Sequence, residues 1–259
     1  MSTSERSTGR RPGYAGGFFT AVGFFTRIPM ARQVATEWTL VDAAWAFPLV
    51  GAGIGAVAAL VFLAAQLVRL GDWPSAFLAV FAGILLTGAL HEDGLADCAD
   101  GIFGGNDPDR RLAIMRDSRH GTYAVLALVL SVGLRAAALA QIGEVIFAAL
   151  ALVAAHALSR ALLPIAMSVL SPARGDGLGA GAGRPRLATS IAGMLIGAAI
   201  GAMALGPLHG LVAIAVAAGA VAAAGAIVQR RILGYTGDVL GAFQQIAEIT
   251  ILLAAAALR

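Results

Sequence analysis

Residues 73–90 read WPSAFLAVFAGILLTGAL, eighteen positions without a charged side chain, and residues 91–101 continue directly as HEDGLADCADG. An uncharged apolar stretch of about 18 residues is long enough to cross the hydrocarbon core of a bilayer as a helix. The carboxylates that follow would be costly inside that core unless they were paired. The two stretches together therefore predict a membrane helix that ends at an acidic boundary.

The composition of the whole chain also indicates a membrane protein. Of 259 residues, 59% are hydrophobic and 13% are charged, whereas a soluble domain carries about 25% charged residues, and the mean hydropathy is +0.83. We predict an all-α fold, a polytopic integral membrane helical bundle of about seven transmembrane helices, with residues 16–30 as a short interfacial or re-entrant segment. The predicted spans are 43–68, 73–90, 121–143, 145–170, 187–206, 210–228 and 238–258.

The distribution of arginines predicts how the bundle is oriented. With seven spans and a cytoplasmic N-terminus, the outer loops hold only Arg69, and Arg259 ends the chain. The other loop arginines then lie on the cytoplasmic side, as the positive-inside rule requires. We expect an integral protein of the bacterial cytoplasmic (inner) membrane with its active site facing the cytoplasm. We expect residues 1–15 to be a disordered cytoplasmic tail and residues 16–259 to be a single transmembrane catalytic domain.

The acidic motif predicts a metal site. If the helix of residues 73–90 runs on through residue 100, Asp93, Asp97 and Asp100 stand at i, i+4 and i+7 and share one face. Three carboxylates so placed repel one another unless a cation neutralises them, and oxygen ligands alone suit Mg²⁺ or Mn²⁺. The alternative is a solvated acidic cap. Glu92 would point away from the three and be solvated, and His91 is either a ligand or an interfacial residue.

Residues 104–123, GGNDPDRRLAIMRDSRHGTY, predict a second charged cluster. Asn106 or Asp107 would cap a helix that runs to about Ser118. Arginine binds phosphate oxygens while a carboxylate holds a metal or takes a proton, so the cluster suits a phosphate ester; an ordinary charged loop is the alternative. Its members are Arg116, Asp117, Ser118, Arg119 and His120.

Two arginines fall inside predicted spans, where charge is costly and function is the first hypothesis. Arg135 could pair with Glu248 in the last span. Arg160, with Ser159 beside it, could line a polar cavity that faces the acids.

Two loop regions complete the candidates. Residues 171–186, SPARGDGLGAGAGRPR, are too rich in glycine to predict a helix and suit a flexible lid, a phosphate cradle or a plain linker. In residues 233–250, LGYTGDVLGAFQQIAEIT, Thr236 or Asp238 would cap the last span. Asp238, Gln244 and Gln245 are candidates to bind the base or sugar of a nucleotide, or a further metal.

Six motifs follow one another along the chain: FFTRIP (24–29), FPLVGAGIG (47–55), HEDGLADCADG (91–101), IMRDSRHGTY (114–123), LSRALLP (158–164) and GYTGDVLGAFQQ (234–245). In this order they resemble the motifs of the cobalamin synthase family, whose members are adenosylcobinamide-GDP ribazoletransferases. The resemblance covers about residues 18 to 258.

The resemblance implies a Mg²⁺-dependent phosphotransfer. The 5′-hydroxyl of α-ribazole, or its 5′-phosphate form, would attack adenosylcobinamide-GDP and release GMP, in the last step of nucleotide-loop assembly in vitamin B12 biosynthesis. Beside these substrates we expect contact with membrane lipid and no nucleic acid, and a homo-oligomer is a candidate assembly.

On this chain we predict three groups of site residues. The metal ligands are Asp93, Asp97, Asp100 and Asp117. The catalytic residues are Asp117, Arg116, Arg119 and Arg160. The substrate-binding residues are His91, Ser118, His120, Ser159, Asp176, Asp238 and Gln244.

Two other functions are weighed against this one. A CDP-alcohol phosphotransferase also carries an aspartate-rich helix end, but its DGxxAR pattern is absent, since CADG follows DGLAD. A cation or small-molecule transporter would be expected to carry acids or broken helices at mid-membrane, whereas the acids here cluster on one side.

Overall fold

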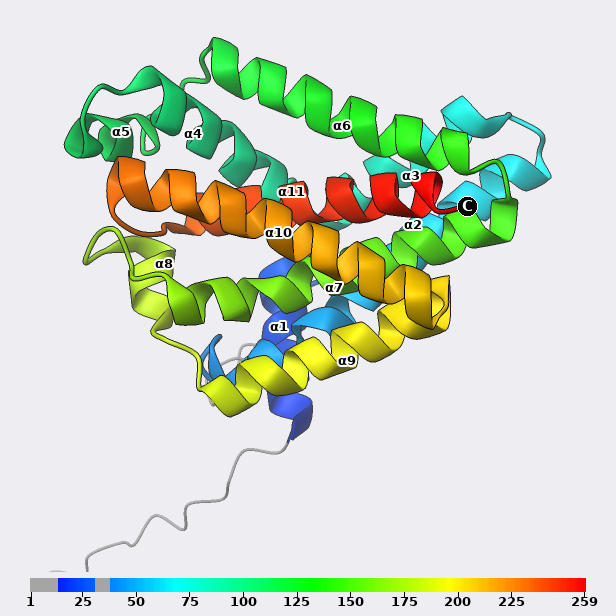
Figure 1. Cartoon of the computed structure of the whole chain (residues 1–259), viewed down its shortest axis with the longest axis horizontal. Helices are drawn as coiled ribbons and strands as arrows, with labels where there is room; N and C mark the ends of the chain where they lie inside the picture. Colours follow the sequence, from blue (N-terminus) through cyan, green and yellow to red (C-terminus); the bar gives the residue numbers. More distant parts are fainter. Residues whose placement is uncertain (1–13, 31–37) are drawn as a thin grey trace, which may run out of the picture.

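The computed structural model of the chain describes residues 14–30 and 38–259, and most of the tail predicted at residues 1–15 lies outside them (Figure 1). Helices make up the described part. No β-strand occurs in it, and one isolated bridge joins Pro172 to Tyr235. The predicted all-α class is therefore confirmed.

Long apolar helices form the bundle. Six are long and apolar enough to cross a membrane within the described residues, and a bent pair brings the number to seven if it counts as one span. The prediction of about seven spans is confirmed at this level. The six are α2 (Phe47–Leu67), α6 (Thr122–Ile142), α7 (Val145–Val169), α9 (Leu187–Leu205), α10 (Pro207–Ile232) and α11 (Gly237–Ala257).

The bent pair corrects the prediction of one helix running from residue 73 through residue 100. α3 (Asp72–Thr87) ends at Gly88, and α4 (Leu90–Gly104) begins after Ala89, at an angle of 91° to α3. Gly88 and Ala89 have φ of +65° and +59°, a left-handed conformation that ends a helix and that glycine adopts at least cost. Asp93, Asp97 and Asp100 nevertheless share one helix, because α4 contains all three.

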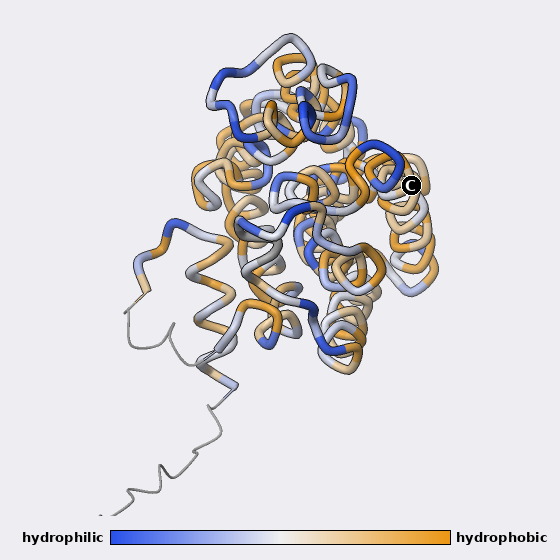
Figure 2. Tube along the Cα trace, turned by 90° about the vertical axis from the view of Figure 1, so that its left-hand side faces the viewer, coloured by the Kyte–Doolittle hydropathy of each residue, from blue (hydrophilic) through white to orange (hydrophobic). Residues whose placement is uncertain are grey.

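A short helix near the N-terminus, α1, leads to a segment that contacts the bend between α3 and α4. α1 (Tyr14–Phe25) has 12 residues, about 18 Å of helix, so it is too short to span a bilayer, as predicted. It runs across the direction of the long helices in both views (Figures 1 and 2). Just beyond it, the Arg27 backbone N–H donates to the Leu86 carbonyl at 2.8 Å, which ties this segment to the end of α3.

Polar connections gather at one end of the bundle. α5 (Pro108–Ile114), α8 (Gly177–Ala182) and the turn between α10 and α11 lie at the left in Figure 1, and the C-terminus lies at the right. Figure 2 looks onto the left-hand end, where hydrophilic loops cover the ends of apolar helices. Two predictions were wrong in detail: α5 ends at Ile114 rather than near Ser118, and the glycine-rich segment contains the short helix α8.

The caps follow the sequence more closely. The Asp107 side chain accepts a hydrogen bond from the Arg110 N–H at 2.9 Å and caps α5. Thr236 accepts one from the Val239 N–H at 3.3 Å and caps α11. Both ends follow the preference for Asp and Thr where the first turn leaves N–H groups without helical partners.

The core is centred on α7, which packs against α2, α9 and α11. Small residues allow these helices to approach closely. At Gly55 of α2, for example, a Cβ atom would come within 2.6 Å of the Leu152 carbonyl oxygen in α7. A 3-10 turn, η1 (Asp42–Ala46), leads the chain into α2 beside α1 and α9.

Candidate active site

A glycine contact between α4 and α11 positions the candidate site. A Cβ atom on Gly94 would lie 2.9 Å from the Asp238 carbonyl oxygen, and one on Gly241 would lie 3.1 Å from the Gly94 Cα. The first distance is shorter than real Cβ contacts and the second is tighter than most, so glycines at these two positions allow the helices to cross closely here. The crossing brings Asp93 of α4 and Asp238 of α11 to one cavity, although 145 positions separate them in the sequence.

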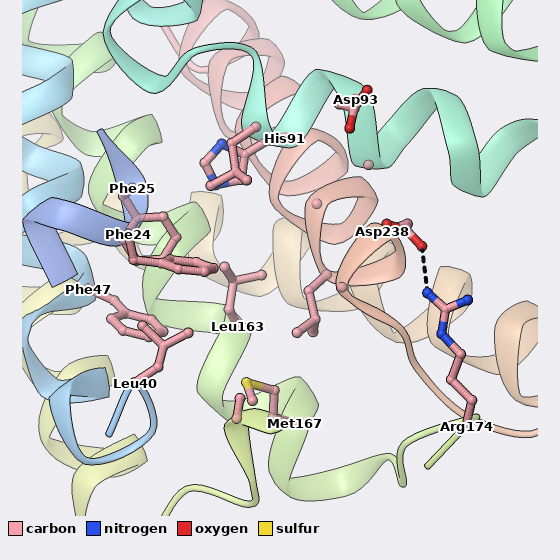
Figure 3. Close-up of a pocket in the computed structure, with 16 residues that line it drawn as sticks. Phe24, Phe25, Leu40, Phe47, His91, Asp93, Leu163, Met167, Arg174 and Asp238 are labelled. Carbon is pink, nitrogen blue, oxygen red and sulfur yellow. Dashed lines mark hydrogen bonds and ion pairs between the residues drawn. The ribbon is translucent and has the colours of Figure 1, made fainter. Parts of the chain in front are cut away.

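This cavity has a volume of about 300 Å³ and is mostly apolar. In Figure 3 the aromatic side chains lie on one side of it, and Asp93, Asp238 and Arg174 lie on the other. His91 stacks on Phe25 with ring centroids 5.7 Å apart. The imidazole is buried, and its Nε2 has no hydrogen-bond partner among the described residues.

Arg174 is a site residue that the sequence analysis missed. Its Nη2 lies 3.5 Å from Asp238 Oδ2, and its buried Nη1 has no partner among the described residues. The backbone beside it is fixed, because the Ala173 N–H donates to the Tyr235 carbonyl at 2.8 Å. The only sequence signal was an arginine in a glycine-rich loop that was read as a lid, cradle or linker.

Asp97 lies one turn further along α4. Its carboxylate is 3.8 Å from His120 Nδ1, and its side chain is 18% exposed. The negative charges of Asp93, Asp238 and Asp100 act on it. Asp93, Asp97 and Asp238 are therefore a group of carboxylates close enough to repel one another, which is the electrostatic condition that favours a bound cation.

Asp100 differs from its predicted role. Its Oδ2 accepts a hydrogen bond from the Gly121 N–H, and its Oδ1 accepts one from the Ala124 N–H at 3.0 Å. Both oxygens thus hold the first N–H groups of α6, where a negative charge is favourable. The side chain is also buried, so we assign Asp100 to the structure of this helix end.

The cluster after α5 lines a second hollow, of about 410 Å³, which includes Asp117, Arg119 and His120. Arg119 binds Asp117 through two nitrogens, at 3.0 and 2.7 Å. These hydrogen bonds lower the pKa of the exposed Asp117 carboxyl to about 2. Arg116 pairs instead with Asp176, and Ser118 is exposed.

Three other predicted site residues lie away from both hollows, in a buried polar network. Arg160 is 1% exposed, and its Nη1 contacts His156 Nδ1 at 3.1 Å. Gln244 donates to Ser159 Oγ at 3.1 Å and also to Glu248. None of Arg160, Ser159 and Gln244 lines the 300 Å³ cavity, so the polar cavity predicted around Arg160 is not found there.

The same network corrects the prediction for Glu92. Instead of being solvated, Glu92 is buried and lies 3.1 Å from Arg135, and it accepts a hydrogen bond from Gln245. Arg135 also lies 3.0 Å from Glu248, which confirms the predicted pair. The two intramembrane arginines are thus offset by two buried glutamates.

Within the described residues, no three Asp, Glu, His or Cys side chains lie close enough together to form a complete metal centre. The predicted set of four ligands is not assembled, because Asp100 caps α6 and Asp117 pairs with Arg119. The carboxylates at the cavity are Asp93 and Asp238, with Asp97 nearby.

Comparison with known proteins identifies related sequences. The profile of the family described as Cobalamin-5-phosphate synthase matches residues 17–256. A protein of Bradyrhizobium diazoefficiens, named adenosylcobinamide-GDP ribazoletransferase, is 47% identical over 243 residues, covering 92% of each chain. A protein of Mesorhizobium japonicum with the same name is 44% identical, covering 90% of this chain and 89% of its own. No solved structure matches the chain significantly.

Proposed function

The chain belongs to the Cobalamin-5-phosphate synthase family, and we propose that it is the transferase for which its relatives are named. It transfers the adenosylcobinamide-phosphate group of adenosylcobinamide-GDP to the 5′-hydroxyl of α-ribazole, or of its 5′-phosphate. The hydroxyl oxygen forms a bond to the cobinamide-linked phosphorus. The bond from this phosphorus to the bridging oxygen breaks, GMP leaves, and the hydroxyl proton passes to a carboxylate. The family match over nearly the whole chain carries this proposal.

The site supports the same chemistry. Asp93 faces the cavity beside Asp238, so it is placed to hold the proton of the attacking hydroxyl. Arg174 has an unpaired buried nitrogen at the same cavity. A guanidinium group with a free donor suits a phosphate oxygen, and it is the group available to bind the diphosphate. Arg116 and Arg119 lie in the connection between α4 and α6, where each is paired with an aspartate, and a phosphate group would have to compete with that partner for them.

A magnesium ion fits this donor set. Magnesium is typically bound by one or two carboxylates together with waters and substrate phosphates, rather than by a complete protein cage. Asp93 and Asp238 would hold it, and Asp97 lies one turn further along α4 from Asp93. When bound, the ion would neutralise charge on the diphosphate and on the departing GMP. Compared with the predicted ligand set, this arrangement leaves out Asp100 and Asp117 and adds Asp238.

The membrane setting completes the proposal. The apolar helices make the chain an integral membrane protein. The arginines of the α4–α6, α7–α9 and α10–α11 connections lie at the end of the bundle that carries the carboxylates. By the positive-inside rule this end faces the cytoplasm, so we place the site at the cytoplasmic face of the bacterial inner membrane.

GMP release from adenosylcobinamide-GDP by the purified protein tests the proposal. We expect release to require both α-ribazole and Mg²⁺, and to stop in Asp93→Asn. The exposed Asp109→Asn, on α5 and remote from the cavity lining, is the matched control and should keep full activity. A folded sample that releases no GMP, but turns over a CDP-linked donor, would support the CDP-alcohol phosphotransferase function instead.

A further inference from the structure

The cavity beside Asp93 has an apolar, aromatic side and a polar side. Phe24, Phe25 and Phe47 form an aromatic wall on one side, extended by Leu163 and Met167. The carboxylates of Asp93 and Asp238 lie on the opposite side (Figure 3). A ligand that fills this space must have a flat apolar part and, within one molecule's length, a polar part that reaches the carboxylates.

The size of the cavity limits the choice among the parts of the two substrates. Its volume of about 300 Å³ is at the lower end of the range for small-molecule sites, about 300–1,000 Å³. A nucleoside fits such a space, whereas a corrin macrocycle with its side chains does not. The corrinoid portion of the donor therefore stays outside the cavity.

Two nucleosides then remain, the guanosine of the donor and the acceptor α-ribazole. Guanine carries hydrogen-bonding groups along most of its edge, and an apolar wall would leave them unpaired at a cost. The benzimidazole base of α-ribazole has a largely apolar edge and a flat aromatic face that can stack on phenylalanine. The aromatic wall therefore fits the acceptor base and disfavours guanine.

Resting on the proposed function, we propose that this cavity is the acceptor subsite. The base of α-ribazole packs against Phe24, Phe25 and Phe47, and its ribose points toward Asp93 and Asp238. This orientation brings the 5′-hydroxyl to the carboxylate side, where the phosphorus of the donor must arrive. The crossing of α4 and α11 at Gly94 and Gly241 thus fixes the distance between the base and the reacting end of the acceptor.

Binding measurements with protein in lipid nanodiscs test this assignment separately from turnover. Leu240 is half-buried and lines the cavity, so Leu240→Trp fills it. We expect at least about tenfold weaker binding of α-ribazole by equilibrium dialysis, because the base and the indole compete for one space, with binding of adenosylcobinamide-GDP within about twofold of the original. Phe24→Leu keeps the apolar surface but removes a ring, and should weaken α-ribazole binding about fivefold to tenfold.

The matched control is Leu211→Trp on α10, where the side chain is 65% exposed and lies outside the cavity; it should bind both substrates normally. Guanosine should fail to displace α-ribazole from the original protein. If Leu240→Trp weakens donor binding and spares α-ribazole, the cavity holds the donor and the assignment is wrong. If neither substrate is affected by either cavity variant, the cavity serves another occupant, such as a lipid chain, and the assignment is also wrong.

Failure of the proposed function gives a different result. If Leu240→Trp weakens the binding of α-ribazole but the original protein never releases GMP from the donor, the acceptor subsite is supported and the proposed function is wrong. If the original protein releases GMP normally and both cavity variants bind α-ribazole normally, the proposed function is supported and the assignment of the acceptor subsite is wrong. If Leu240→Trp does not fold, Phe24→Leu against the same control decides the question.

Discussion

Arg135→Met removes a guanidinium group that lies 3.1 Å from Glu92 and 3.0 Å from Glu248 inside the bundle. The side chains of all three residues are less than about a tenth exposed, and methionine fills a similar length without charge. Glu248 keeps contacts with His156 at 3.1 Å and with Arg160 at 3.9 Å. Among the described residues, Glu92 keeps the Gln245 amide as its hydrogen-bond donor and has no second cationic partner.

The expected loss of stability arises mainly at Glu92, because Glu248 keeps His156 and Arg160 beside it whereas Glu92 keeps no cationic partner. Breaking a buried ion pair by removing one partner costs about 3–5 kcal/mol, because a charge is left buried and uncompensated. For a chain of this size, that loss corresponds to a Tm lower by about 6–20 °C. Removing the second charge as well should recover part of it, so Arg135→Met with Glu92→Gln should be more stable than Arg135→Met alone, by about 1–3 kcal/mol of coupling.

Thermal unfolding in a mild detergent, followed by circular dichroism, measures these differences. Arg116→Met is the matched control, because Arg116 pairs with Asp176 at the surface, where the side chains are 54% and 67% exposed. An exposed pair contributes about 0–1 kcal/mol, so the control should unfold within about 4 °C of the original. If Arg135→Met unfolded together with this control, or if Glu92→Gln failed to rescue it, the network would not be the stabilising unit described above.

Three further predictions concern the site. Asp100→Ala should lower the free energy of unfolding by about 1–2 kcal/mol, since it leaves N–H groups of α6 unpaired. Asp93→Asn should leave the free energy of unfolding unchanged and abolish GMP release. The reverse pattern would indicate that Asp100, and not Asp93, binds the metal. Gly94→Ala should lose activity, because its Cβ would lie 2.9 Å from the Asp238 carbonyl oxygen and must push α4 from α11; unchanged activity would refute the close crossing. Arg119→Met should raise the pKa of Asp117 from about 2 toward about 3.9, measured by NMR titration, since the depressed pKa comes from the Arg119 hydrogen bonds; an unchanged value would contradict that cause. The stabilising effect of this pair is present at neutral pH and is lost as the pH falls through the folded-state pKa.

The location of the candidate site was predicted in part. The spacing of Asp93 and Asp97 in one helix holds, because residues four apart share a helix face wherever the helix lies. The predicted group of Asp93, Asp97, Asp100 and Asp117 does not assemble. Asp100 is turned toward the first N–H groups of α6, and no pattern within the acidic motif indicates that this helix start would lie beside it.

The sequence by itself determined the features that depend on neighbouring residues. Long uncharged runs specify the membrane helices, since each must satisfy its own backbone hydrogen bonds in lipid. Asp107 and Thr236 begin helices because their side chains reach N–H groups three residues ahead.

Only the tertiary structure decided the features that join distant segments. The contact of Gly94 with Gly241 brings Asp238 to Asp93, the 91° bend after α3 turns the acidic helix along α11 and α6, and Arg135 pairs with Glu92. In each case the partner is supplied by packing between helices far apart in the chain. Local periodicity gives the face on which a side chain lies but leaves the element opposite that face undetermined.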